Sequence, residues 1–233
     1  MRKIFIIISF FIINFLSAQV KNAQIDSIYK PDIYYLEDQI YFGISYVALV
    51  DLPENIKQNG FSNAIKFGYI RDIPINKRRN IGFGLGVGYG RDEYFQNLRI
   101  STDESSAEPV YEILGTGYKS NSLILNKVEI PFEIRVRGSN PEKFAFWRLY
   151  AGVTFAYVYA STSEYYSNKI HVQYKDLKLI NPWQYGVSLS LGYGKWNFNY
   201  YYGISDIIKD GIEVSGKSVK MKEQRFGIIF YFL

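Results

Sequence analysis

The sequence predicts an all-β fold, namely an eight-stranded antiparallel up-and-down transmembrane outer-membrane β-barrel with periplasmic N- and C-termini. Three observations lead to this prediction. Bulky residues alternate with small or polar ones in segments of about ten residues, the composition is 18% aromatic, and no apolar run beyond the first residues is long enough for a membrane helix. Alternate residues of a strand face opposite sides, and only helices and closed barrels satisfy every backbone polar group in lipid.

The N-terminus is typical of an export signal. Arg2 and Lys3 precede the apolar run "IFIIISFFIINF", and "LSAQ" then places the small residue Ala18 before a plausible cleavage site. The apolar run is shorter than the roughly 20 residues that a membrane span requires, so we expect a cleaved signal peptide over residues 1–18. A periplasmic lead-in over residues 19–37 and a barrel domain over residues 38–233 would follow.

The composition excludes several kinds of chemistry. The chain has no cysteine, which excludes disulfides, cysteine-ligated metals and thiol nucleophiles. The net charge of +5 falls to +3 once residues 1–18, with their two positive and no negative charges, are removed. For an exported chain of such modest charge, we expect no nucleic-acid partner.

Eight segments alternate strictly enough to be strands. In "NIGFGLGVGYG" every even position from Gly82 to Gly90 is glycine and every odd position is large. The nucleotide-binding pattern GxGxxG needs a two-residue gap that does not occur here, so this stretch too is predicted as a strand. The eight segments cover residues 39–49, 64–73, 80–90, 126–137, 147–159, 184–193, 196–205 and 225–233.

The two faces of these segments predict an inside-out barrel. Glycine shares its face with serine, asparagine and charge, whereas a soluble sandwich or lipocalin-like barrel would place that face in water. We expect the bulky face to contact lipid and the other face to line a narrow lumen. The glycines would make room for long lumen side chains, because eight strands leave an interior just wide enough to fill. The expected structural lumen network is Lys66, Glu129, Glu133, Arg135, Arg148 and Arg225, interpreted as a salt-bridged plug, with a conduction path as the alternative.

The ends of the strands predict the orientation. Trp147, Trp183 and Trp196 each fall near a strand end, as in an aromatic girdle. Short connections ("PINKRR", "GSNPEK", "GK") alternate with long ones near residues 51–60, 91–119, 161–179 and 208–221, and long loops of such barrels face the exterior. Two residues fit poorly: Arg71 on the lipid face should lie at the periplasmic rim or beyond a bulge, and Pro131 should mark a bulge.

Candidate catalytic and metal-binding residues are few. His171 is the only histidine, in a long loop near Ser167 and Asp176, where a Ser/His pair could deacylate lipid. A solvated loop residue is the simpler interpretation, and we expect no enzyme. The acidic residues Asp103, Glu104, Glu108 and Glu112 could take a cation at the cell surface, although a solvated loop explains them equally well. No metal site and no cofactor are expected.

The turn "NKRRN" carries three adjacent cations, Lys77, Arg78 and Arg79, on the predicted periplasmic side. Such a turn could contact an acidic partner, and anchoring to phosphate headgroups is the alternative. With its neighbours, it gives a candidate periplasmic partner contact at Asp72, Lys77, Arg78, Arg79 and Asn80.

Several stretches together resemble one family. These are "GYIRDIPINKRRNIGFGLGVGYG", "DQIYFGISYVALV", "VEIPFEIRVR", "FWRLYAGVTFAYVYAS" and "MKEQRFGIIFYFL", and they are similar to the PorT (SprT) family of outer-membrane barrels. The run "IRDIPINKRRN" is the most specific element. The resemblance implies a component of the type IX secretion system, which exports proteins with a C-terminal sorting domain and in some species supports gliding motility. It carries over no catalytic residues.

Taken together, the sequence predicts a non-enzymatic integral protein of the cell outer membrane that holds or assembles other secretion components. Its expected partners are outer-membrane lipid and other type IX components, with no small-molecule substrate. The alternative is a small barrel of another class, either a lipid-modifying enzyme that uses His171 or a narrow channel.

Overall fold

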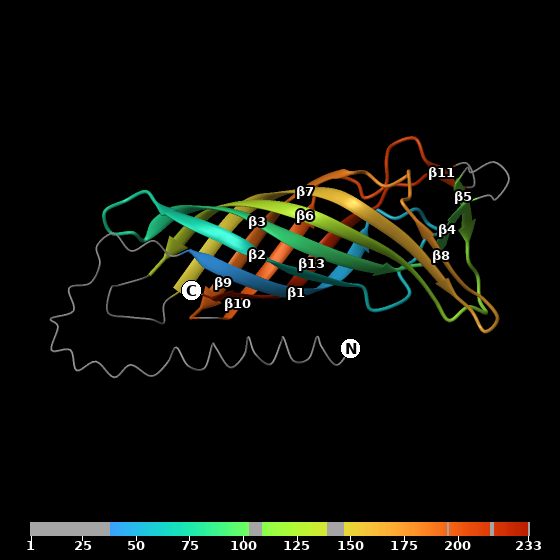
Figure 1. Ribbon diagram of the computed structural model, residues 1–233, viewed down its shortest axis with the longest axis horizontal. Coiled ribbons are helices and arrows are strands. Elements are labelled where there is room, and N and C mark those ends of the chain that lie inside the picture. Colours follow the sequence, from blue (N-terminus) through green and yellow to red (C-terminus); the bar gives the residue numbers. More distant parts are fainter. Residues whose placement is uncertain (1–37, 103–108, 139–146, 195, 215–216, 233) are drawn as a thin grey trace, which may run out of the picture. The chain divides into compact units, whose positions relative to one another are not determined.

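The computed structural model describes residues 38–102, 109–138, 147–194, 196–214 and 217–232, so the predicted signal peptide and lead-in lie outside the described residues. Eight long strands form the barrel (Figure 1): β1 (Gln39–Val50), β2 (Asn63–Pro74), β3 (Ile81–Phe95), β6 (Ser120–Arg137), β7 (Trp147–Tyr166), β9 (Trp183–Tyr193), β10 (Trp196–Gly203) and β13 (Lys222–Phe232). No helix in the described ranges is long and apolar enough to cross a membrane.

The sheet closes on itself. The strands pair in the order β6-β3-β2-β1-β13-β10-β9-β7, all antiparallel, and β6 also pairs with β7. The predicted eight-stranded antiparallel barrel is therefore confirmed. The start of β1, the end of β13 and the β2–β3 turn lie at the same end, because Ile40 pairs with both Phe232 and Tyr69. We call this the short-turn end and the opposite one the long-loop end.

The stagger of the strands sets their tilt. A row of paired residues that leaves β7 at Trp147 returns to β7 at Tyr157, ten residues further along. Ten residues of stagger over eight strands correspond to a tilt of about 40°. The row is, in order, Trp147, Tyr193, Trp196, Phe230, Phe42, Phe67, Tyr89, Val128 and Tyr157, and all but Val128 are aromatic. We call it the aromatic row.

The three tryptophans mark two levels of the wall. Each is about 65% exposed and begins a strand. Trp147 and Trp196 both pair with Tyr193 at the short-turn end, whereas Trp183 lies ten residues from Tyr193 along β9 and pairs with Tyr157. Ten residues extend about 33 Å, or about 25 Å along the axis at that tilt, which equals the height of the apolar band of an outer-membrane barrel. We call the part between the two levels the membrane band.

Within this band, the bulky face points outward and the polar face inward, as predicted. On β6, Ile130, Phe132 and Ile134 are 41 to 50% exposed, while the alternating residues Glu129, Glu133 and Arg135 are buried. The glycines of β3 also make the predicted room. A Cβ on Gly84 would lie 2.6 Å from Arg135 Nε, and one on Gly90 would lie 2.7 Å from Glu129 Oε1.

Much of the predicted long loops is ordered β-structure. The hairpin β4 (Leu98–Thr102) and β5 (Pro109–Ile113) follows β3, β8 (His171–Lys175) pairs with the extension of β7, and β11 (Glu213–Val214) pairs with β12 (Lys217–Ser218). Figure 1 shows these elements gathered at one end. Their buried apolar side chains form one cluster with the ends of the long strands, the apolar cap: Val47, Leu49, Ile56, Ala64, Tyr94, Leu98, Ile100, Leu123, Leu125, Val158, Leu177, Leu179, Ile180, Ile207, Ile208, Val219 and Met221.

The two poorly fitting residues have different outcomes. Arg71 does face outward, and its Nε lies 4.0 Å from Asp38 Oδ1, next to the first residue of β1. It therefore lies at the rim of the short-turn end, as expected. The bulge expected at Pro131 is wrong, because Pro131 pairs with Thr154 in unbroken register. The register shifts instead opposite Asn126 and Lys127, where Tyr159 is the extra residue of β7.

Candidate functional site

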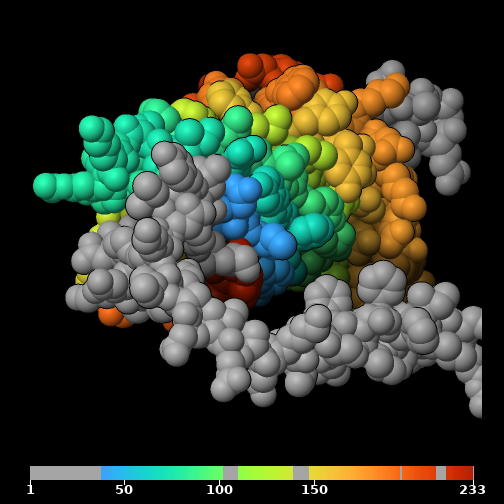
Figure 2. Space-filling view, turned by 60° about the vertical axis from the view of Figure 1, so that its left-hand side comes forward, coloured from blue at the N-terminus to red at the C-terminus, as the bar shows by residue number. Residues whose placement is uncertain are grey.

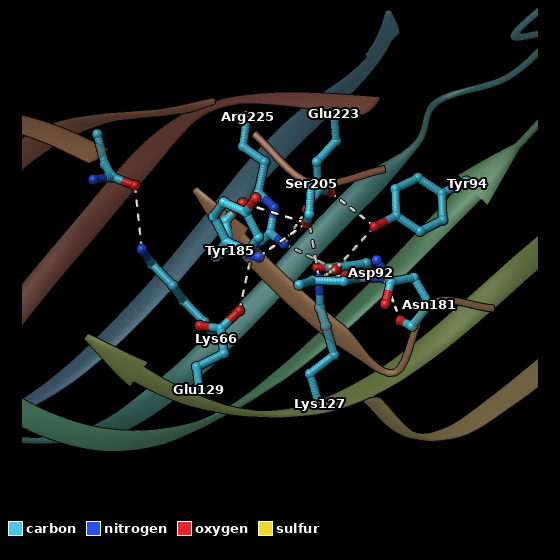
Figure 3. Close-up of polar contacts among 12 residues, drawn as sticks. Lys66, Asp92, Tyr94, Lys127, Glu129, Asn181, Tyr185, Ser205, Glu223 and Arg225 are labelled. Carbon is cyan, nitrogen blue, oxygen red and sulfur yellow. Dashed lines mark hydrogen bonds and ion pairs between the residues drawn. The ribbon is translucent and has the colours of Figure 1, made fainter. Parts of the chain in front are cut away.

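The lumen holds a charge network around Arg225 (Figure 3). Its Nη2 lies 2.6 Å from Glu223 Oε1 and 3.0 Å from Asp92 Oδ2, and its Nη1 lies 3.3 Å from Glu129 Oε1. The guanidinium carbon also lies 4.6 Å from the centre of the Tyr201 ring. One arginine of β13 thus joins carboxylates from β3, β6 and its own strand.

Lysines complete this network. Lys127 forms an ion pair with Asp92 and lies 3.5 Å from Glu223, and Lys66 Nζ donates to Asn199 Oδ1 at 3.2 Å. The network contains three cations, Lys66, Lys127 and Arg225, and three anions, Asp92, Glu129 and Glu223. Their formal charges balance, which a buried charge cluster needs because each unpaired ion is costly to desolvate.

A second group lies nearer the short-turn end. Arg135 pairs with Glu133 at 2.9 Å, donates from Nη1 to Gln39 Oε1 at 3.0 Å, and its guanidinium carbon lies 4.5 Å from the centre of the Tyr150 ring. Arg137 pairs with Asp72, and Arg148 is buried on the same side. All six predicted lumen residues therefore line the interior, divided between two groups rather than joined in one.

The β2–β3 turn is hydrogen-bonded to the end of β6. Arg137 Nε donates to the carbonyl of Arg79 at 2.7 Å, and its backbone N–H donates to the carbonyl of Asn80 at 2.8 Å. Arg79 has a left-handed backbone, with φ of 54°. Lys77 and Arg78 are exposed, Arg79 and Asn80 are half-buried, and the turn, in teal, projects from the molecule in Figure 2.

Asp72 is the residue of this group that the structure corrects. It is fully buried inside the barrel, where Arg137 binds it, so it is not part of an exposed contact surface. Its position follows from the alternation of β2, because Asp72 shares its parity with the inward residue Ile70. Asp72 instead binds the arginine that holds the turn.

In the part of the chain that the structure describes, no hydrogen bond joins the side chains of Ser167, His171 and Asp176. Ser167 Oγ accepts the backbone N–H groups of Lys169 and Ile170 at 3.4 and 3.2 Å, and so closes its own turn. His171 is exposed and packs edge-on against Tyr166, with ring centres 5.5 Å apart. Asp176 donates its backbone N–H to the Ser161 carbonyl.

The acidic loop is only partly described. Glu112 lies 3.3 Å from Arg99, whereas Asp103, Glu104 and Glu108 lie outside the described residues. Among the residues that the structure describes, no group of three or more histidine, cysteine, aspartate or glutamate side chains could hold a metal ion.

The expected lumen network lacks three members of the charge network around Arg225, namely Lys127, Asp92 and Glu223. Lys127 lies within a predicted segment, whereas the two carboxylates lie just beyond the ends of theirs. The predicted segments ended at Gly90 and began at Arg225, each two residues short. Continuing the same alternation by one step would have placed both carboxylates in the lumen beside Arg225. The signal that could have identified them is therefore the inward–outward alternation of residues along β3 and β13.

Comparison with known proteins agrees with this architecture. The model of the outer membrane protein beta-barrel domain family matches residues 18–209. The chain belongs to this family. Its members are outer-membrane proteins by the family's description, which supports the predicted localisation. A search of curated proteins found none that matches.

Solved structures of other barrels resemble this protein only distantly. The attachment invasion locus protein Ail of Yersinia pestis matches with a TM-score of 0.32 and 9% identity, over 84% of this chain and 97% of Ail. A quintuple mutant of the porin of Rh. blastica matches with a TM-score of 0.20 and 8% identity, over 85% of this chain and all of the porin chain.

Proposed function

We propose that this barrel is a non-enzymatic component of the type IX secretion system, which holds or assembles other secretion components in the outer membrane. The observation that carries this proposal is the filled interior. Two groups of paired charges, with tyrosines stacked on their arginines, occupy a bore that eight strands make only just wide enough for side chains. A barrel filled in this way acts through its surfaces rather than through its lumen.

The resemblance to the PorT family supplies the particular system. The run "IRDIPINKRRN" that carries it spans the end of β2 and the projecting turn. In the proposed orientation, with both termini periplasmic, this turn presents Lys77 and Arg78 to soluble or membrane-bound partners. Arg137, paired with Asp72, donates two hydrogen bonds to the turn from inside, so the two cations extend from an anchored base, which favours recognition of an acidic partner.

The test is a deletion of the gene, followed by measurement of proteins with the C-terminal sorting domain in periplasm, outer membrane and medium. We expect these proteins to be retained in the periplasm. The wild-type gene and His171→Ala should restore export, whereas a variant with Lys77, Arg78 and Arg79 all changed to Gln should not. Lys169→Gln with Lys175→Gln, two exposed lysines of the long-loop end, is the matched control and should restore export.

Other outcomes would decide against the proposal. Normal export after the deletion, together with altered lipid that His171→Ala fails to restore, would favour a lipid-modifying enzyme. A steady conductance of the purified protein in planar bilayers would favour a narrow channel. Retention that all variants rescue would leave the barrel in secretion but remove the turn from its mechanism.

A further inference from the structure

A groove of about 220 Å³ opens beside β7, where the chain crosses from β8 to β9. Its floor is apolar and includes the buried residues Val158, Leu177 and Ile180, together with Pro182. Its rim is polar and exposed, and consists of Tyr159, Asp176, Lys178 and Lys209. We call this feature the β7 groove.

The groove is a consequence of how β7 is paired. Strand β9 pairs with β7 only as far as Tyr157, and β8 begins to pair at Thr162. Between these points the crossing segment is held by individual bonds: Val158 N–H donates to the Pro182 carbonyl at 2.8 Å, and Leu177 N–H donates to Ser161 Oγ at 2.8 Å. The bulge residue Tyr159 lies in the same gap. The groove therefore has an ordered backbone on both sides.

The rim carries a net positive charge. Lys209 Nζ donates to the backbone carbonyl of Lys178 at 2.6 Å, which holds the Lys209 ammonium group at the rim, next to the residue that carries the second exposed lysine side chain. With Asp176 as the one carboxylate in the described lining, the formal charge is +1. Two ammonium groups above an apolar floor match a ligand with an anionic head and an apolar body.

The depth of the groove identifies the source of such a ligand. Val158 and Pro182 directly adjoin Tyr157 and Trp183, whose rings pack 4.9 Å apart at the upper level of the membrane band. Aromatic residues at this level sit among lipid headgroups. A soluble anion needs no apolar floor, whereas a membrane lipid brings a headgroup to this height and acyl chains to the wall below.

We infer that the β7 groove binds the phosphorylated headgroup of a membrane lipid, through Lys178 and Lys209, in the leaflet at the long-loop end. In the orientation proposed above this is the outer leaflet. The inference goes beyond the secretion role and does not depend on it. The groove would fix the rotation of the barrel relative to a bound lipid at one point of its circumference.

The test uses the purified full mature chain in detergent micelles that contain diphosphoryl lipid A, with bound lipid counted by native mass spectrometry. We expect Lys178→Gln with Lys209→Gln to weaken binding about 25-fold, since each lysine near an anionic surface contributes about fivefold. Replacing both lysines by arginine should retain binding, and Lys169→Gln with Lys175→Gln is the control that should leave it unchanged. The heat-induced shift in electrophoretic mobility verifies that each variant is folded.

Three results would overturn the inference. An equal loss in the Lys169 and Lys175 control would show a general effect of surface charge. Equal binding of lipid A without phosphates would show that the apolar floor alone acts. Displacement of lipid A by inorganic phosphate at matched concentration would show a soluble-anion site. Lipid binding is measured on the isolated protein and export is measured in cells. A negative result for lipid binding therefore does not count against the secretion role, and a negative result for export does not count against the lipid site.

Discussion

The membrane band and the apolar cap follow opposite rules of burial, although the same strands build both. In the band, large apolar side chains face outward and charges face inward. In the cap, large apolar side chains face inward, as in a soluble protein. On β6 the change occurs between Leu125, which is fully buried in the cap, and Lys127, which is fully buried in the charge network.

The difference shows that the solvent around a strand, rather than the strand itself, decides which face is apolar. Around the band the solvent is lipid, so an outward leucine loses nothing by exposure, and the inward face must be neutralised by ion pairs. Around the cap the solvent is water, so burial of apolar surface again stabilises the fold. The bulge at Tyr159 lies close to this change, and above it the inward positions of β7 become odd-numbered, as the buried residues Ser161 and Ser163 show.

The largest effect should come from breaking the charge network of the band. Arg225→Met would leave Asp92, Glu129 and Glu223 buried with only two lysines, and removal of one partner from a buried ion pair costs about 3 to 5 kcal/mol. Urea unfolding of the protein in lipid vesicles measures this loss. Lys222→Met, on the same strand, removes a partly exposed partner of Asp51 and should change stability little. Equal losses in the two variants would contradict a central role for Arg225.

A pair of leucines should sharpen the comparison. Leu125→Ala in the cap should cost about 2 to 5 kcal/mol, because the protein cannot refill the cavity completely. Leu189→Ala, outward on β9 and 48% exposed, should cost much less, because lipid tails are as apolar as leucine and can fill the space. Unfolding in vesicles and proteolysis of the long-loop end measure the two effects. If the two variants lost similar amounts of stability, the Leu189 side chain would be packed against protein, as Leu125 is, rather than against lipid.

The smallest of the three effects should come from a charge in the band. Leu189 lies near the middle of the stretch from Trp183 to Tyr193, and Leu189→Arg should cost about 2 to 4 kcal/mol at such a depth. Leu189→Phe is the control of similar bulk and should be tolerated. If Leu189→Arg unfolds at the same urea concentration as the wild type in vesicles, the outward face of β9 does not contact lipid.

The sequence predicted the band much better than the cap. Strict alternation from Gly82 to Gly90 and from Val128 to Arg137 is a local signal, so strand number, facing and most lumen residues followed from it. Asp92 and Glu223 were lost only because the segments were cut short. The cap gives no such signal, because residues such as Leu177, Leu179, Ile207 and Ile208 lie in irregular segments that meet only after the strands have paired.

The bulge at Tyr159 and the anchoring of the β2–β3 turn are two further features that the sequence alone did not predict. The segment "AYVYAS" is rich in aromatic and small residues, so the pattern does not show that Tyr159 is one residue too many. Pro131, by contrast, predicted a bulge, and the strand pairs there in unbroken register. For the turn, the exposed cations were visible in the sequence. The buried residue that holds the turn, Arg137, is not in the expected lumen network, and its contact joins positions 58 residues apart, so no local pattern indicated it.

The aromatic row gives the lipid-facing wall a handedness. It begins at Trp147 near one face of the bilayer and climbs with each strand until it reaches Tyr157 near the other face. A lipid that diffuses once around the barrel therefore meets stiff rings at a depth that changes steadily, against its glycerol region on one side of the wall and against its chain ends on another. The aromatic row thus joins the two tryptophan levels along one oblique line, and its contacts with lipid differ in depth from one side of the barrel to the other.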